Sequence, residues 1–278
     1  DIQRNKLSLS SKNKKIREGV APETQITLIS LRTNSYPFNS LNVRLAISKS
    51  INRNLISKKV SYNLRKPLRS IVPPIFKESN QDLWPEYNPK EARTLLEKEG
   101  FCNGKKLIFP LTYRSNVPSD KLISLIIQED IKNNLSDCIS IDINGVESTT
   151  MYENLSKGVY PAAIYDWTGL YSDPEAYLKP LLSCNEIVEN ICKEGESALS
   201  GSFWASKEIE NLFEESDSKV GNYRLNNLIK IEKIASESIP YIPLWISSQR
   251  AWSQNKISKP IFNGAGIILL SELELINE

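Results

Sequence analysis

Residues 160–167, with the sequence YPAAIYDW, form an almost entirely apolar run inside a chain of 278 residues. A short apolar run without polar alternation is typical of a strand that is buried on both faces of a sheet. Further strands are predicted at residues 26–31, 107–111, 138–143 and 241–246, which are rich in apolar and β-branched side chains. We therefore expect a sheet with residues 160–167 near its centre.

Amphipathic segments alternate with these strands and predict helices. One helix is indicated by apolar residues at helical spacing, with charged residues on the other faces: Val43, Ala46, Ile47, Ile51 and Leu55 against Arg44, Lys49 and Arg53. Asn88 and Pro89 are typical of a helix start, and Asp173 is expected to cap another helix. Further helices are predicted over residues 119–135, 149–157, 206–215 and 223–236. This alternation predicts an α/β fold with a mixed sheet and flanking helices.

The two ends of the chain show weaker patterns of apolar and polar residues than the rest. Residues 1–25 and 255–278 are expected to be segments that pack against another domain. The N-terminal residues are too polar for a signal peptide, and no apolar run approaches membrane-spanning length. We expect the chain as given to be soluble.

The composition argues against several classes of function. The chain contains no histidine, which excludes Ser-His-Asp and Cys-His nucleophiles, histidine-ligated zinc and histidine-based proton transfer. A formal net charge of +2 gives no indication of nucleic-acid binding. We accordingly predict no catalytic residue, no metal site, no cofactor and no nucleic-acid partner.

The cysteines allow one disulfide but do not require it. None of the four forms a C-x-x-C pair, so neither a zinc ribbon nor a thioredoxin-type site is indicated. Cys184 and Cys192 lie in a loop-like stretch and could be bridged in an oxidising compartment. Free buried thiols are the alternative.

Six segments in order resemble a known family, the extracytoplasmic solute-binding proteins of family 5, which includes the oligopeptide-, dipeptide- and nickel-binding types. Its motifs are similar to residues 36–48 (YPFNSLNVRLAIS), 51–56 (INRNLI), 71–74 (IVPP), 87–101 (YNPKEARTLLEKEGF), 166–174 (DWTGLYSDP) and 237–245 (ESIPYIPLW). Each segment alone is a weak signal. Their shared order along the chain makes the resemblance specific.

The resemblance implies a fold, a function and a cellular location. The chain would be one lobe of a type II (class C) periplasmic-binding-protein fold, with residues 26–254 forming the second lobe. Residues 1–25 would be the crossover from a missing first lobe, and residues 255–278 the return to it. Such a protein captures a peptide or peptide-like solute between two lobes and delivers it to the permease of an ABC importer. It would act outside the cytoplasm, in the periplasm or its equivalent, and would not be an enzyme.

The resemblance also implies binding residues. In peptide-binding relatives the strand that ends at the tryptophan pairs with the main chain of the ligand, which here indicates Tyr165, Asp166, Trp167, Thr168 and Gly169, followed by Leu170 and Tyr171. Trp167 could equally be a core residue. Arg114 falls where dipeptide-type relatives bind the ligand carboxylate, although a surface arginine is the alternative reading.

One position departs from the family pattern. Peptide binders carry an aspartate three residues after the tryptophan, and it pairs with the α-ammonium of the ligand. This chain has Leu170 there, which cannot compensate a buried ammonium, unless Asp166 or Asp173 substitutes. We therefore predict a solute without a free α-amine: a modified peptide, an opine-like compound or a metal chelate.

Other classes of function stay open at this point. Asp166 with Asp173 or Glu175 could flank a glycosidic bond in a hydrolase, although Asp173 and Glu175 also suit the first turn of a helix. The same fold could serve a sensor or a scaffold without transport. A third alternative is that the chain is a non-functional remnant of a binding protein. Such a remnant would expose the apolar surface meant for the first lobe and would self-associate.

Overall fold

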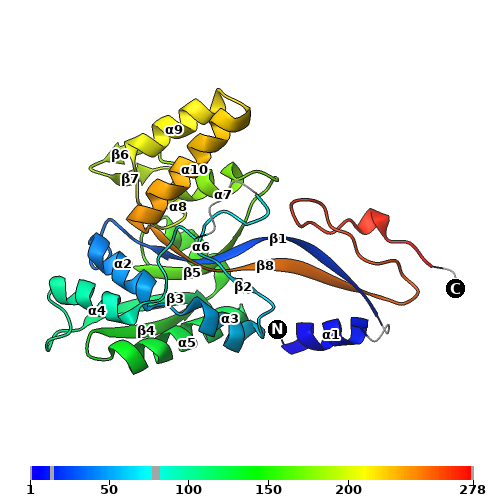
Figure 1. Ribbon diagram of the computed structural model, residues 1–278, viewed down its shortest axis with the longest axis horizontal. Coiled ribbons are helices and arrows are strands. Elements are labelled where there is room, and N and C mark those ends of the chain that lie inside the picture. The colour runs from blue at the N-terminus through cyan, green and yellow to red at the C-terminus, as the bar shows by residue number, and fades with distance from the viewer. Residues whose placement is uncertain (1, 13–15, 77–81, 277–278) are drawn as a thin grey trace.

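The computed structural model describes residues 2–12, 16–76 and 82–276. Its main feature is a six-stranded mixed sheet in the order β2-β8-β1-β5-β3-β4 (Figure 1). The strands are β1 (Ile16–Leu31), β2 (Lys66–Pro67), β3 (Leu107–Arg114), β4 (Ile139–Val146), β5 (Ala162–Thr168) and β8 (Tyr241–Gln254). A separate hairpin is formed by β6 (Glu186–Val188) and β7 (Ile191–Glu194). The α/β fold with a mixed sheet and flanking helices is therefore confirmed.

Strand β5 lies inside the sheet, as its apolar sequence predicts. It pairs antiparallel with β1, where Ile164 faces Ile29, and parallel with β3, where Ala162 faces Leu111. The four residues from Ala162 to Tyr165 are buried. Because β3 and β5 run in the same direction, their carboxyl ends meet at one edge of the sheet.

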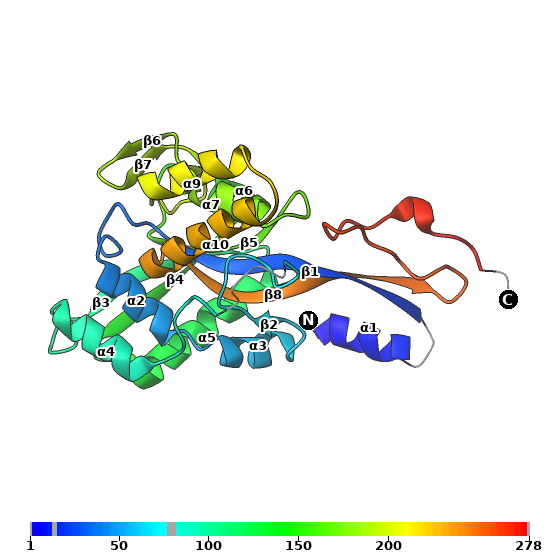
Figure 2. The same ribbon diagram turned by 45° about the horizontal axis from the view of Figure 1, so that its top comes forward.

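Helices cover both faces of this sheet. Figures 1 and 2 show one group on one side: α2 (Leu41–Ser50), α3 (Arg53–Ser61), α4 (Pro89–Lys98) and α5 (Pro118–Leu135). The opposite side carries α7 (Glu175–Leu182), α8 (Glu196–Leu199), α9 (Lys207–Asp217) and α10 (Gly221–Ser238). The remaining helical segments are α1 (Ile2–Lys12), α6 (Ser148–Leu155) and a short 3-10 turn, η1 (Leu270–Glu272). None of the described helices is both long enough and apolar enough to cross a bilayer.

The first predicted helix is in fact two helices. Ile51 has an extended backbone, with φ −99° and ψ 113°, and it ends α2. Asn52 then caps α3 by accepting the N–H of Leu55 at 3.0 Å. The prediction that Arg44 and Arg53 lie on non-core faces was wrong, because both side chains are buried and their guanidinium groups donate to backbone carbonyls.

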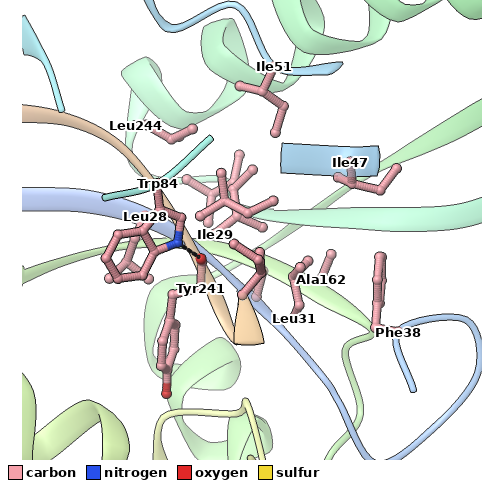
Figure 3. Close-up of a cluster of buried hydrophobic side chains, with 14 of the residues drawn as sticks. Leu28, Ile29, Leu31, Phe38, Ile47, Ile51, Trp84, Ala162, Tyr241 and Leu244 are labelled. Carbon is pink, nitrogen blue, oxygen red and sulfur yellow. Dashed lines mark hydrogen bonds between the residues drawn. The ribbon is translucent and has the colours of Figure 1, made fainter. Parts of the chain in front are cut away.

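The core joins the sheet to both helical layers (Figure 3). Its largest fully buried side chains include Trp84, Trp245, Tyr177, Tyr241 and Phe38. The indole Nε1 of Trp84 donates to the carbonyl of Tyr241 at 2.7 Å, so a loop residue is fixed to the first residue of β8. Burial of such large rings supplies much of the stability of a domain of this size.

Strands β1 and β8 are longer than predicted and form a ribbon. They pair antiparallel from Ser30–Tyr241 out to Ile16–Gln254, and the register shifts between Val20 and Gln25. The outer part of the ribbon projects beyond the helical layers, next to α1 and the C-terminal segment (Figures 1 and 2). With fewer neighbours there, its residues lack the continuous burial that marks the inner strand, which explains the weak pattern before residue 26.

Two disulfides occur in the structure. Cys184 and Cys192 are joined beside the β6–β7 hairpin, with 8 residues of sequence separation. Cys102 and Cys138 are also joined, with a separation of 36 residues. The sequence suggested no pairing for these two, because only the fold brings the end of α4 next to the start of β4.

Candidate functional site

The predicted site residues lie at the carboxyl ends of β3 and β5. In open α/β sheets this edge is where ligands bind. Arg114 is the last residue of β3, and Asp166, Trp167 and Thr168 end β5. The antiparallel neighbour β1 adds Thr27 directly opposite Asp166.

Asp166 is held by donors on both of its oxygens. Oδ1 accepts a hydrogen bond from the hydroxyl of Thr27, and Oδ2 accepts one from Nη2 of Arg114 at 2.8 Å. The Thr27 oxygen itself accepts from Nε1 of Trp245 at 2.6 Å. A chain of hydrogen bonds therefore fixes the Asp166 carboxylate across three strands, while 21% of its side chain stays exposed.

Arg114 is shared between two carboxylates. Its Nε donates to Oδ2 of Asp120 at 2.7 Å, and its Nη1 contacts the hydroxyl of Tyr152 at 3.3 Å. The side chain is 7% exposed. Burial, partly offset by the hydrogen bond and charge of Arg114, raises the pKa of Asp120 to about 6. A ligand carboxylate would have to displace one of these partners. The geometry therefore favours a role for Arg114 in positioning Asp166 over direct binding of a ligand.

A hollow of about 670 Å³ lies elsewhere, at the β2 edge, but a smaller one of about 240 Å³ adjoins Asp166. Three predicted residues line the smaller hollow: Tyr165, Asp166 and Trp167. Tyr165 is buried, and its hydroxyl donates to the carbonyl of Ser200 at 2.8 Å. The other lining residues are Tyr152, Leu155, Pro180, Glu196, Leu199 and Ser200. We call this space the β5 hollow.

Trp167 lies between the core and the β5 hollow. Its ring is partly buried and packs against the main core, and it also lines the β5 hollow. The indole Nε1 donates to the carbonyl of Ala176 at 3.0 Å, which ties the end of β5 to α7. The ring therefore offers an apolar wall that is fixed in orientation.

The residues after Trp167 form the rim. Gly169 is packed so closely that a Cβ there would lie 2.7 Å from the ring of Tyr177. Leu170 is 85% exposed, and Tyr171 is exposed as well. Neither of these two lines the β5 hollow.

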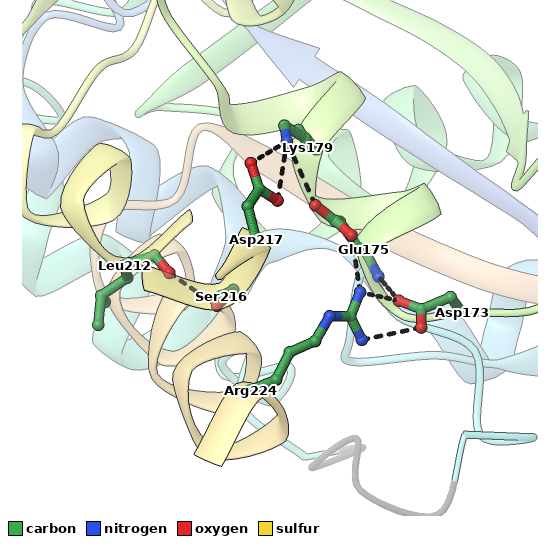
Figure 4. Close-up of polar contacts among 7 residues, drawn as sticks. All are labelled: Asp173, Glu175, Lys179, Leu212, Ser216, Asp217 and Arg224. Atoms are coloured by element: carbon green, nitrogen blue, oxygen red, sulfur yellow. Dashed lines mark hydrogen bonds and ion pairs between the residues drawn. The ribbon is translucent and has the colours of Figure 1, made fainter. Parts of the chain in front are cut away.

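A second polar cluster, shown in Figure 4, lies beside the start of α7. Arg224 of α10 donates to both oxygens of Asp173 at 2.9 Å and to Glu175 at 2.6 Å. Asp173 also accepts the N–H of Glu175 at 2.8 Å, but the N-cap of α7 is Pro174 and not Asp173 as the sequence predicted. Each carboxylate considered for glycoside hydrolysis is thus bound to a guanidinium, Asp166 to Arg114 and the other two to Arg224.

The described residues suggest no metal centre. In residues 2–12, 16–76 and 82–276, no group of three or more Cys, Asp or Glu side chains is arranged to hold a metal ion.

Comparison with known proteins places the chain in a family. Residues 2–188 match the family described as bacterial extracellular solute-binding proteins, family 5 Middle. The chain belongs to this family. Family 5 consists of binding proteins. The match confirms the resemblance that the six sequence segments indicate.

Relatives in family 5 are similar at low identity. Heme-binding protein A of Haemophilus influenzae is 26% identical over 58% of this chain and 30% of its own length. The periplasmic oligopeptide-binding protein OppA of Salmonella typhimurium is 27% identical over 53% of this chain and 28% of its own length. OppA of Bacillus subtilis is 22% identical over 87% of this chain and 43% of its own length. The chain thus spans less than half of each of these relatives.

Solved structures share the fold of the family 5 chain. A Pseudoalteromonas dipeptide-binding protein in complex with Met-Leu superposes with a TM-score of 0.82 and 20% identity, covering 98% of this chain and 52% of that one. NikA of Brucella suis in complex with Fe(III)-EDTA gives a TM-score of 0.77 and 17% identity, with 98% and 55% covered. The type II periplasmic-binding-protein fold is therefore confirmed.

The polar residues at this edge that the sequence analysis missed include Thr27, Tyr152, Glu196 and Asp120. Thr27 lies opposite Asp166 only because β1 pairs with β5, and Tyr152 and Glu196 reach the hollow from α6 and α8. Asp120 had a local signal, since an acidic residue in the first turn of α5 follows Arg114 closely. Glu196 is exposed and lines the β5 hollow.

Proposed function

We propose that this chain supplies one lobe of a two-lobed extracytoplasmic binding protein, which captures a peptide or peptide-like solute for an ABC importer. The observation that carries the proposal is the β5 hollow, lined by Tyr165, Asp166 and Trp167 at the carboxyl edge of the sheet. The relatives named as oligopeptide- and dipeptide-binding proteins support the class of solute. The role needs binding and release without covalent chemistry.

In this proposal the ribbon of β1 and β8 leads to a partner lobe. Its outer part leaves the body of the domain together with α1 and the segment from residue 255 (Figure 2). Apolar residues on these end segments are exposed, including Leu9, Ile267, Leu270 and Leu275. A lobe that covered them would remove this surface from water and close the hollow from the other side.

We further propose that the solute lacks a free α-amine. Leu170 offers no charge, and the carboxylates of Asp166 and Asp173 are each bound to an arginine. An ammonium at the end of β5 would therefore compete with a guanidinium for its counter-ion. Glu196 is the residue of the hollow through which a free amine would bind if this proposal were wrong.

The test is an NMR titration of the isotope-labelled chain with trialanine and with N-acetyl-trialanine. We expect the acetylated peptide to shift the amide signals of residues 165–169 and to bind more tightly than the free-amine form. Asp166→Asn should weaken this binding about tenfold, since it removes the ion pair with Arg114 that fixes this edge of the β5 hollow. Asp142→Asn, an exposed acidic residue on β4, is the matched control and should leave it unchanged.

Two results would contradict these proposals separately. Shifts confined to other parts of the chain would exclude the β5 hollow as the solute site. Tighter binding of free trialanine, lost on Glu196→Gln, would keep the site and overturn the proposal about the amine.

A further inference from the structure

A buried arginine near β2, the edge strand farthest from β4, has no counter-ion among residues 2–12, 16–76 and 82–276. Arg53, the first residue of α3, is 5% exposed. Its Nε donates to the carbonyl of Pro243 at 2.6 Å, and its Nη1 donates to that of Pro85 at 3.1 Å. Its Nη2 is buried and has no hydrogen-bond partner, and no described carboxylate lies within ion-pair distance of the guanidinium. Burial, with a further contribution from the charge of Arg69, lowers the pKa of Arg53 to about 9.

Leaving a buried cation without compensation is costly. Backbone carbonyls provide partial negative charge for Arg53, but they do not neutralise it. The nearby guanidinium of Arg69 adds repulsion. Among the residues that the structure describes, nothing neutralises the charge of Arg53, so an anion would be favoured beside it.

Arg53 lines a hollow of about 670 Å³. Helix α3 and the short strand β2 form two of its sides and lie next to each other in Figures 1 and 2. Its charged lining residues are three cations, Arg53, Lys66 and Arg69, and two acids, Asp82 and Glu86. We call this space the α3 hollow.

The counter-ions already present at the α3 hollow are weakly held. Arg69 pairs with Asp82 at 2.9 Å and with Glu86 at 3.2 Å, but both acidic side chains are more than 70% exposed. Lys66 pairs with Glu23 at 2.7 Å and is itself largely exposed. Ion pairs exposed to this degree contribute little to stability, so an incoming anion can replace them.

The start of α3 supplies further donors to the same space. Asn52, Arg53 and Asn54 all line the α3 hollow. The Asn52 side chain takes the N–H of Leu55, whereas the N–H groups of Arg53 and Asn54 belong to the first turn, where no acceptor exists within the helix. A helix N-terminus with free N–H groups attracts anions, and oxyanions above all.

We propose that the α3 hollow is a binding site for a phosphate group, either as inorganic phosphate or as the ester of a small organic compound. A dianion would compensate Arg53 and Arg69 together, and the planar guanidinium of Arg69 suits two phosphate oxygens at once. The hollow exceeds the volume of a phosphate alone, which leaves room for an ester group. β8 and β1 separate β2 from β5 in the sheet, so this site is distinct from the β5 hollow.

The test follows the amide signals of Arg53 and Asn54 by NMR while the isotope-labelled chain is titrated with inorganic phosphate, with glycerol 3-phosphate and with sodium chloride at matched ionic strength. We expect saturable shifts with at least one phosphate compound and no saturation with chloride. Tighter binding of glycerol 3-phosphate would identify the ester as the ligand. Equal or tighter binding of inorganic phosphate would identify the free ion.

Variants separate this site from general surface charge. Arg69→Gln should weaken phosphate binding about tenfold, and Lys66→Gln about threefold, because each removes one cation of the hollow. Arg93→Gln is the matched control, since Arg93 is also paired with exposed acids but lies on α4, away from the hollow. Equal effects of Arg69→Gln and Arg93→Gln, or the absence of saturable shifts at Arg53 and Asn54, would overturn the proposal.

Discussion

At the scale of single residues, Arg44 joins three parts of the chain through backbone carbonyls. Its Nη1 donates to the carbonyl of Phe38 at 2.7 Å, and its Nε donates to that of Ser238 at 2.8 Å. The side chain is buried, and burial lowers the pKa of its guanidinium to about 10. Arg44 thereby fixes the loop before α2 to the end of α10.

Arg44→Met should lower the free energy of unfolding by about 2–3 kcal/mol, because it leaves buried carbonyls without donors. Urea denaturation followed by circular dichroism measures this difference. Lys49→Gln, on the same helix, removes one ion pair with exposed Glu91 and should cost under about 1 kcal/mol. Equal losses of unfolding free energy in the two variants would show that the contacts of Arg44 with the carbonyls do not stabilise the fold.

Glu232 is a buried carboxyl group that makes stability depend on pH. It accepts hydrogen bonds from the Ser70 hydroxyl and from the N–H groups of Ile71 at 3.2 Å and Val72 at 3.3 Å. Burial raises its pKa from 4.5 to about 7. The folded state therefore holds the proton more tightly than the unfolded state, and this contribution to stability is lost as the pH rises through about 7.

Glu232→Gln should remove this dependence, because the amide stays neutral at every pH. Between about pH 4.5 and pH 7 the natural chain should lose up to about 3 kcal/mol of unfolding free energy relative to the variant. Denaturant titrations at several pH values measure both curves. Parallel curves would contradict the prediction.

At the scale of elements, the two disulfides close loops of different length. A crosslink stabilises mainly by restricting the unfolded chain, and the effect grows with the loop it closes. Replacing Cys102 and Cys138 by serine should cost about 4 kcal/mol, and replacing Cys184 and Cys192 about 2.5 kcal/mol. Thermal denaturation of both double variants, with and without a reductant, measures these differences. A larger loss for the shorter loop would contradict the entropic argument.

The pair of α9 and α10 depends on a polar contact with α7. Arg224 reaches Asp173 and Glu175, and Lys179 of α7 reaches Asp217 at the end of α9 (Figure 4). Arg224→Gln should destabilise the chain by about 1–2 kcal/mol and speed amide exchange in the first turns of α10, because two partly buried carboxylates lose their cation. Lys230→Gln, exposed on the same helix, should change neither. Unchanged exchange in the Arg224 variant would show that apolar packing alone holds the helix pair.

Most elements could be predicted because their periodicity is local. Neighbouring residues alone were enough to predict the start of α4 at Asn88 and Pro89 and the central position of β5. The break between α2 and α3 was missed because Ile51 is buried like the helical residues around it. Arg114 and Asp166 were both singled out from the sequence, but the bond between them depends on the pairing of β3 with β5, which no local pattern contains.

At the scale of the whole molecule, apolar side chains gather on the segments farthest from the sheet. Leu9 on α1 and Ile267, Leu270 and Leu275 near the C-terminus are exposed, Leu275 to 81%. Exposed apolar residues of this kind favour association. We expect the chain to form dimers or larger species as its concentration rises, measured by light scattering. Leu270→Ser with Leu275→Ser should reduce association, whereas Val220→Ser, an exposed control before α10, should not. A chain that stays monomeric throughout would contradict this expectation.

The ribbon of β1 and β8 has a mechanical consequence. A two-stranded ribbon twists more strongly than a wide sheet, and an irregular register increases the twist locally. Between Val20 and Gln25 the pairing shifts twice, just where the ribbon leaves the six-stranded sheet. A domain attached beyond Ile16 and Gln254 would therefore rotate relative to the sheet about the irregular part of the ribbon near Glu23.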